Sequence, residues 1–178
     1  MTPRFGLRFV ALVAVFASVL SAPAAAQRTQ WTEVHGGFSG GSSTLDTGGE
    51  IGIARDWSDR WTSYGFGATW LAGETSDPKQ QMWGMVLNSS MRLHLPRERL
   101  RPYVEAGFNV YFIGYENIDP DERKRSFTNP GLSLGTGAVW RARNDLDVRF
   151  GVVAHFAEVD IGGEGEDWLT GLVGISFR

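Results

Sequence analysis

The 178-residue sequence contains no cysteine, which excludes a disulfide framework, thiolate chemistry and cysteine-based metal sites. After residue 26 it also contains no apolar run that approaches the roughly 20 residues of a transmembrane helix. Positive charge is not in excess, because 20 acidic residues outnumber 17 lysines and arginines, and this argues against a nucleic-acid partner. These absences leave open a membrane protein built from strands, since hydropathy scans miss β-barrels.

The N-terminal segment has the pattern of a secretory signal peptide. Arg4 and Arg8 make the start basic, and an apolar run of twelve residues and then three alanines follow. An uncleaved membrane anchor is the rival interpretation, but this run is short for a span of about 20 residues. We therefore predict a signal peptide over 1–26, cleavage before Gln27 and a single barrel domain over 27–178. The mature chain then has 15 basic and 20 acidic residues, a formal charge of −5.

Strand-like alternation is clearest over residues 101–112. From Val104 to Phe112 every second residue is apolar, and the residues between them are mostly polar or small. Side chains alternate faces along a strand, so this segment has one apolar and one polar face. Such a segment fits either a soluble sheet over a buried core or a tilted membrane strand of roughly 9–11 residues. The choice depends on which face points inward.

Seven further segments alternate in the same way and are separated by turn signals. The eight predicted strands cover residues 30–38, 47–57, 61–72, 82–95, 101–112, 130–142, 146–158 and 168–177. The first, third, fifth and seventh connections are longer and rich in glycine or charge, whereas the other three are short turns. Transmembrane barrels have short periplasmic turns and longer outer loops. The pattern predicts an all-β fold, an eight-stranded antiparallel up-and-down transmembrane β-barrel.

The composition of the two faces favours the apolar face outside. The polar face is mostly Gly, Ser, Thr and Asn. It carries few charged residues for a solvated surface, and its side chains are small enough for a narrow lumen. The apolar face is bulky and almost uncharged, as a lipid face must be, because a Lys or Arg at mid-bilayer costs about 2–4 kcal/mol. Arg55 lies on the outward face of the second strand, and we expect it near a membrane surface. The alternative is a soluble periplasmic, lipocalin-like barrel with the apolar face inward.

The tryptophans are expected to form two belts at the membrane interfaces. Four fall at the short-turn ends of the predicted strands, Trp31, Trp57, Trp61 and Trp140. Three fall at or near the long-loop ends, Trp70, Trp83 and Trp168. The prolines at positions 78, 96, 102, 120 and 130 are expected in loops or at strand starts, where no ladder hydrogen bond is lost.

The whole pattern resembles the small eight-stranded bacterial outer-membrane barrels, the family of outer membrane protein X and the transmembrane domain of outer membrane protein A. The closing segment, residues 171–177, resembles the end signal read by the barrel-assembly machinery, with alternate apolar residues before Phe177. The family usually ends on the aromatic, whereas Arg178 follows here. The resemblance implies a monomer in the Gram-negative bacterial outer membrane. Its expected partners are outer-membrane lipids, lipopolysaccharide and, during biogenesis, the barrel-assembly machinery.

Ionisable side chains are predicted to face the lumen. They are Glu33, Glu50, Glu105, Arg92, Arg149, His35, His94 and His155. One interpretation is a proton path or a small catalytic site. The other is an internal salt-bridge network, because buried charges must pair. An eight-stranded barrel is just wide enough for side chains to fill it. We therefore expect a filled lumen and no open pore.

Some barrels in the resembling group are lipid A deacylases or acyltransferases. The deacylases of this size carry a His with a Ser two residues on, as the core of a Ser-His-Glu triad. Here Ala157 stands two residues after His155. Ser89 and Ser90 lie near His94 in sequence, but sequence distance alone makes no triad. We predict that the protein is not an enzyme and has no catalytic, cofactor-binding or metal-binding residues. A lipid A-modifying enzyme is the alternative.

Two loops carry weaker signals. Residues 116–125 mix acidic with basic side chains, which suits either contact with lipopolysaccharide phosphates or an ordinary solvated loop. The acidic, glycine-rich segment 160–167 lacks the Asp/Asn spacing of a calcium loop. The expected role is therefore structural or surface-interacting, in an outer-membrane barrel that is not an open porin.

Overall fold

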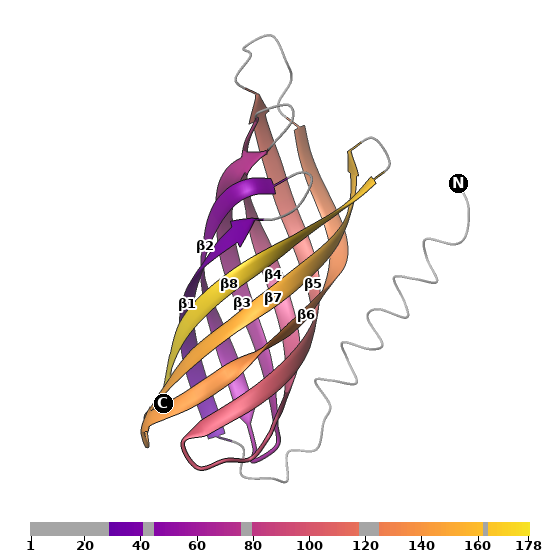
Figure 1. Ribbon diagram of the computed structural model, residues 1–178. Coiled ribbons are helices and arrows are strands. Elements are labelled where there is room, and N and C mark those ends of the chain that lie inside the picture. The colour runs from indigo at the N-terminus through magenta and orange to yellow at the C-terminus, as the bar shows by residue number, and fades with distance from the viewer. Residues whose placement is uncertain (1–28, 41–44, 76–79, 118–124, 162–163) are drawn as a thin grey trace, which may run out of the picture.

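The computed structural model describes residues 29–40, 45–75, 80–117, 125–161 and 164–178 (Figure 1). The strands are, in chain order, β1 (Thr29–Gly40), β2 (Leu45–Ser58), β3 (Thr62–Thr75), β4 (Gln80–His94), β5 (Leu100–Asn117), β6 (Arg125–Arg143), β7 (Leu146–Ile161) and β8 (Glu164–Phe177). Each strand pairs antiparallel with the next, and β8 returns to pair with β1, so the sheet closes into an up-and-down barrel. The predicted fold is confirmed. The predicted signal peptide over 1–26 lies outside the described residues.

Closure leaves the sheet without a free edge, which matters because an unpaired backbone group in hydrocarbon costs several kcal/mol. The closing ladder of β1 and β8 runs from Thr32 opposite Phe177 to Gly40 opposite Leu169. The first residues of β1 and the last of β8 therefore meet at the same end as the three short turns (Figure 1). No helix in the described residues is long and apolar enough to cross a membrane.

The short turn between β2 and β3 is held by one aspartate. Both side-chain oxygens of Asp59 accept hydrogen bonds: Oδ1 from the backbone N–H groups of Trp61 and Thr62, and Oδ2 from the Thr62 hydroxyl, each at 2.7 Å. An aspartate that binds backbone groups two and three residues on is a common way to fix a tight turn. The short turn predicted between the second and third strands does form.

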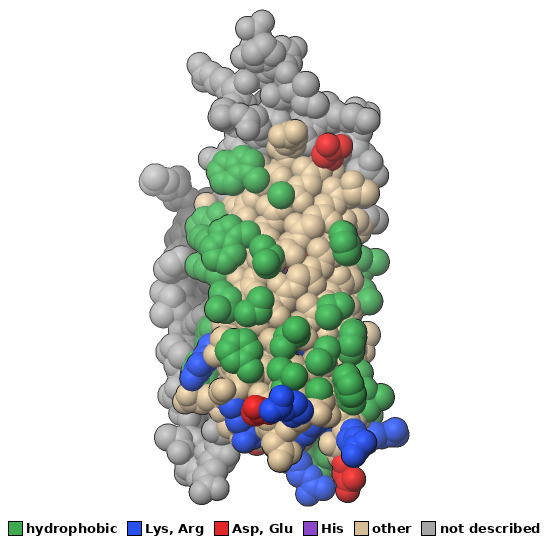
Figure 2. Space-filling model, turned by 90° about the vertical axis from the view of Figure 1, so that its left-hand side faces the viewer, with side chains coloured by type: hydrophobic (Ala, Val, Ile, Leu, Met, Phe, Trp, Pro, Cys, Tyr) green, Lys and Arg blue, Asp and Glu red, His purple; other side chains and the backbone are tan. Residues whose placement is uncertain are grey.

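The apolar face of the barrel points outward. On β7 and β8, Phe150 and Val173 are 47% and 51% exposed, whereas Leu172, one residue away from Val173, is 6% exposed. Apolar side chains are spread over the barrel wall, and charged side chains gather at the short-turn rim below them (Figure 2). The predicted assignment of the two faces is confirmed.

The prediction of tryptophan belts is wrong for two of the seven residues. Trp31 and Trp168 are each 4% exposed and lie inside the barrel. Trp31 is two residues before the buried Glu33, and Trp168 is two before the buried Thr170, so strand alternation places both on the inner face. Four of the others do lie outside and about half exposed: Trp61, Trp70, Trp83 and Trp140.

Pro130 lies within β6 rather than at its start, because the strands extend further toward the long-loop end than predicted. Pro130 is opposite Val110 on β5, and the ladder between β6 and β7 begins one residue later, at Gly131. The missing N–H group therefore falls beyond the end of that ladder. Two prolines, Pro78 and Pro120, lie outside the described residues.

Candidate functional site

Five charged side chains fill the half of the lumen nearer the short turns, and we call this set the charged half. They are Glu33 on β1, Asp56 on β2, Arg92 on β4, Glu105 on β5 and Arg149 on β7, and none is more than 9% exposed. Arg92 bonds Glu105 at 2.7 Å and Asp56 at 3.0 Å, and Arg149 contacts Glu33 at 3.1 Å. The network ties together five of the eight strands.

The charges fit because small residues face them. A Cβ atom at Gly65 would collide with Asp56, and one at Gly151 would collide with the Tyr103 hydroxyl. A narrow lumen cannot hold a large residue at every inward position. Glycine at these two positions therefore leaves room for Asp56 and Tyr103 in the lumen.

Next along the axis lies a layer of hydroxyl groups and one histidine. His35 contacts Thr69 through Nε2 at 3.1 Å and Glu33 through Nδ1 at 3.4 Å. Thr170 donates to Glu50 at 3.3 Å. A cavity of about 50 Å³ lies between this layer and the charged half. It has room for about one water molecule, whose share of liquid volume is about 30 Å³.

The half of the lumen nearer the long loops is filled differently, and we call it the apolar half. It is made of Leu71, Met82, Val86, Tyr111, Ile113, Ala157 and Trp168. His155 stacks on the Trp168 ring, with centroids 5.0 Å apart and an interplanar angle of 13°. Its Nδ1 contacts the Tyr111 hydroxyl at 3.1 Å. Buried side chains therefore occupy both halves of the lumen.

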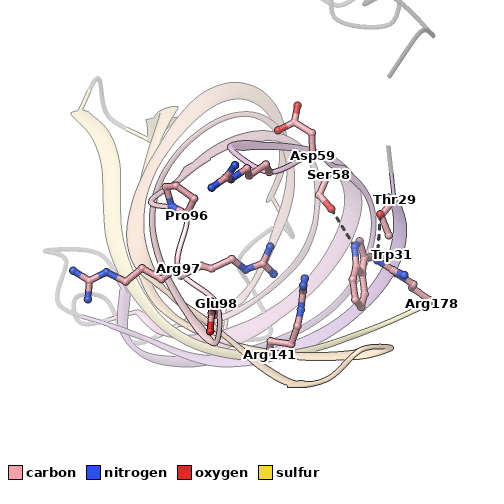
Figure 3. A pocket seen from close by; sticks show the side chains of 11 residues that line it. Thr29, Trp31, Ser58, Asp59, Pro96, Arg97, Glu98, Arg141 and Arg178 are labelled. Atoms are coloured by element: carbon pink, nitrogen blue, oxygen red, sulfur yellow. Dashed lines mark hydrogen bonds between the residues drawn. The ribbon is translucent and has the colours of Figure 1, made fainter. Parts of the chain in front are cut away.

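Below the charged half, the barrel opens at the short turns into a pocket of about 500 Å³, which we call the arginine mouth (Figure 3). Its lining consists of Thr29, Trp31, Ser58, Asp59, Arg60, Pro96, Arg97, Glu98, Arg101, Arg141 and Arg178. Arg101 and Arg141 both bind the buried Asp147. With about 500 Å³, the mouth is larger than the cavity of about 50 Å³ beside the charged half.

All three histidines face the lumen rather than the outer wall, and none forms the suggested triad. His94 Nε2 lies 2.9 Å from Ser63 Oγ, not from Ser89 or Ser90. Ser63 and His94 are only 4% and 7% exposed, so a substrate cannot reach this pair. His155 is enclosed between Tyr111 and Trp168.

The ionisable residues predicted to face the lumen all do so, but the prediction missed two partners. Asp56 and Asp147 are 4% and 3% exposed and make ion pairs inside the barrel. Alternation from Glu50 along β2 reaches Asp56, and alternation from Arg149 along β7 reaches Asp147. This counting, continued to the strand ends, would have found both.

The two loops with weaker signals lie largely outside the described residues. The side chains of residues 116–125 and 160–166 lie outside those described. Among the described residues, no group of three or more His, Asp or Glu could hold a metal ion.

Comparison with solved structures identifies the fold. Neisserial surface protein A superposes with a TM-score of 0.68 at 10% identity over 86% of this chain and 99% of its own. The outer membrane protein OprG from Pseudomonas aeruginosa gives 0.58 at 11% identity, over 85% and 97%. The outer membrane enzyme PagL gives 0.55 at 11% identity, over 83% and 99%. No protein-family model and no curated protein matches the sequence. The chain has the fold of the small eight-stranded outer-membrane barrels, and identities this low carry the fold alone.

Proposed function

We propose that the protein is a monomeric barrel of the bacterial outer membrane with a structural or surface-interaction role and no open pore. The observation that carries this proposal is the pairing of an apolar outer wall with a filled lumen. Phe150 and Val173 on the outer wall are about half exposed. A soluble barrel buries its apolar face, so this exposed apolar wall favours contact with lipid over contact with water. Neisserial surface protein A, which has the same fold, is a surface protein by name.

The buried side chains along the lumen support a passive role rather than transport. An ion on the axis would have to pass Trp168 and Ile113 and then displace the pairs made by Arg92 and Arg149. Breaking buried ion pairs costs several kcal/mol. In planar bilayers we expect the purified protein to give no steady channel conductance, measured beside an open porin as the positive control. Regular single-channel steps would contradict the proposal.

A lipid A-modifying enzyme is the second candidate, favoured by the shared fold with PagL, which is an enzyme. An enzyme that acts on membrane lipid needs its nucleophile and base where lipid can reach them. Here the His94 and Ser63 pair is enclosed in the lumen. Mass spectrometry of lipid A from cells with and without the protein decides the question, and the same lipid A in both supports the passive role. Labelling by a serine-reactive phosphonate would support the enzyme.

The soluble periplasmic barrel is the third candidate, and extraction tests it. We expect the protein to stay with membranes in alkaline carbonate and to shift its gel migration on heating, as closed membrane barrels do. Release by carbonate alone would support the soluble alternative. Contact with lipopolysaccharide, assembly by the barrel-assembly machinery and the signal peptide over 1–26 belong to the same proposal. A mature N-terminus at Gln27, found by mass spectrometry, would support export.

A further inference from the structure

The arginine mouth carries more positive charge than its own carboxylates balance. Five arginines line it, against Asp59 and Glu98. Asp59 already accepts three hydrogen bonds in its turn, so its oxygens are engaged. Arg101 and Arg141 share the single buried carboxylate of Asp147. A concave site in which one sign of charge is in excess concentrates ions of the opposite sign.

Two of these cations, Arg141 and Arg178, are held in place before any ligand arrives. The Arg178 and Arg141 guanidinium groups lie 4.8 Å and 6.0 Å from the centre of the Trp31 ring, within cation–π range. The ring is itself fixed by a 3.1 Å hydrogen bond from Nε1 to Ser58. Arg141 also bonds Asp147 through Nε at 3.1 Å. Side chains ordered in advance lose little entropy on binding, and this raises affinity.

The geometry leaves guanidinium donors directed toward a ligand. Arg141 rises from the wall with its guanidinium in the open middle of the mouth (Figure 3). Its two hydrogen bonds to Asp147 use Nε and Nη2, and Nη1 takes part in neither. A planar guanidinium matches the two oxygens of a phosphate or carboxylate. Because Trp31 already contacts two arginines, its ring is a poor platform for a stacked sugar.

We propose that the arginine mouth binds an oxyanion with at least two negative charges, of the phosphate class. Arginines approach from two turns, two strands and the C-terminal residue, so a ligand with several anionic oxygens contacts more of them than a single carboxylate does. A volume of about 500 Å³ accommodates a diphosphate or a phosphate-bearing headgroup. Anion binding by the mouth does not depend on the proposed function. Only the expectation that the mouth faces the periplasm rests on that proposal.

Titration calorimetry with inorganic pyrophosphate tests the site on the full-length mature protein in a non-ionic detergent at low salt. We expect saturable binding with one ligand per barrel, which weakens as salt is added. The double variant Arg97→Gln with Arg141→Gln should weaken binding at least tenfold. Arg141→Gln also removes the ion pair with Asp147. The single variant Arg97→Gln, in an exposed turn, tests the site while that ion pair stays intact. It should weaken binding at least threefold.

Arg143→Gln is the matched control. It removes the same charge from the same rim, but Arg143 does not line the mouth. Its affinity for pyrophosphate should stay within twofold of the wild type. Absence of saturable binding by the wild type, or an equal loss in Arg143→Gln, would overturn the proposal. Heat-dependent gel migration, measured on each variant, separates a lost site from a lost barrel.

Lipid nanodiscs distinguish the two sources of such an anion. If the ligand is a lipid headgroup, nanodiscs of phosphatidylglycerol should lower pyrophosphate affinity at least tenfold relative to nanodiscs of phosphatidylcholine. Equal affinity in both supports a soluble ligand. If the barrel is heat-modifiable and resists carbonate but binds no pyrophosphate, the mouth proposal is wrong and the proposed function survives.

Discussion

The two halves of the lumen solve the same packing problem with opposite chemistry. The charged half fills the barrel with two arginines and three carboxylates from five strands. The apolar half fills it with side chains that interlock by shape, such as Ile113 and Trp168. A charge network fails as a unit, because losing one partner leaves the others buried and unpaired. A truncation in a packed cluster costs the removed contacts and the cavity that it leaves, but it leaves no charge unpaired. The predictions below test this difference, from the largest expected effect to the smallest.

Arg92→Met should produce the largest loss. Arg92 bonds three carboxylates, and its removal takes this shared cation away from Glu105, Asp56 and Glu33. We expect a loss of about 3–5 kcal/mol in the free energy of unfolding, because removing one partner of a buried ion pair leaves the other charge buried and unpaired. Urea unfolding in phospholipid vesicles, followed by tryptophan fluorescence, measures it.

The double variant Arg92→Met with Glu105→Gln is the control for this prediction. Neutralising one of the stranded carboxylates should recover part of the lost stability. Equal or additive losses in the two variants would mean that the network does not act as a unit.

Val173→Arg tests the wall that both halves share. Val173 is 51% exposed on β8 and lies opposite Phe150. A cation at mid-bilayer costs about 2–4 kcal/mol. The same unfolding assay should show this loss in vesicles, and Val173→Ala as the comparison variant should show much less. If Val173→Arg lost less unfolding free energy than Val173→Ala, position 173 would face water rather than lipid.

Ile113→Val tests the apolar half. Ile113 is 2% exposed within the cluster around Trp168. Removing one buried methylene should cost about 0.5–1.5 kcal/mol and leave the charged half intact. A loss as large as that of Arg92→Met would erase the proposed difference between the two halves.

Arg143→Gln should have the smallest effect on stability. Its pair with Asp145 is 3.5 Å long, and the two side chains are 74% and 63% exposed. Exposed ion pairs contribute about 0–1 kcal/mol, and less at high salt. We expect a change within about 0.5 kcal/mol by urea unfolding. A change above 2 kcal/mol would show that rim charges matter as much as lumen charges.

The sequence predicts the barrel well because a two-residue period is easily seen. Eight alternating segments with short and long connections predicted strand number, order and the outward apolar face. Alternation fades where Phe112 and Ile113 are both apolar, and there the strands were predicted too short. Ile113 belongs to the apolar half of the lumen. A lumen that is itself apolar at one end removes the contrast on which the pattern depends.

The arginine mouth could not be predicted in the same way. Its residues come from the start of β1, two turns, β5, β6 and the C-terminal residue, and only the closed barrel brings them together. Arg178 bonds Thr29, 149 residues away in sequence. The inward position of Trp31 was missed because a tryptophan at a strand end suits a membrane belt as well as a lumen. Only counting from Glu33 separates the two.

Nitroxide accessibility measures the orientation of the wall most directly, and the absence of cysteine allows a single label at each chosen position. Val173→Cys carries the label on the wall, and Arg143→Cys carries it on the rim as the water-exposed reference. In vesicles, the label at position 173 should be relaxed strongly by oxygen and weakly by a water-soluble nickel complex, with the reverse at position 143. Strong relaxation by nickel at position 173 would contradict a lipid-facing apolar wall.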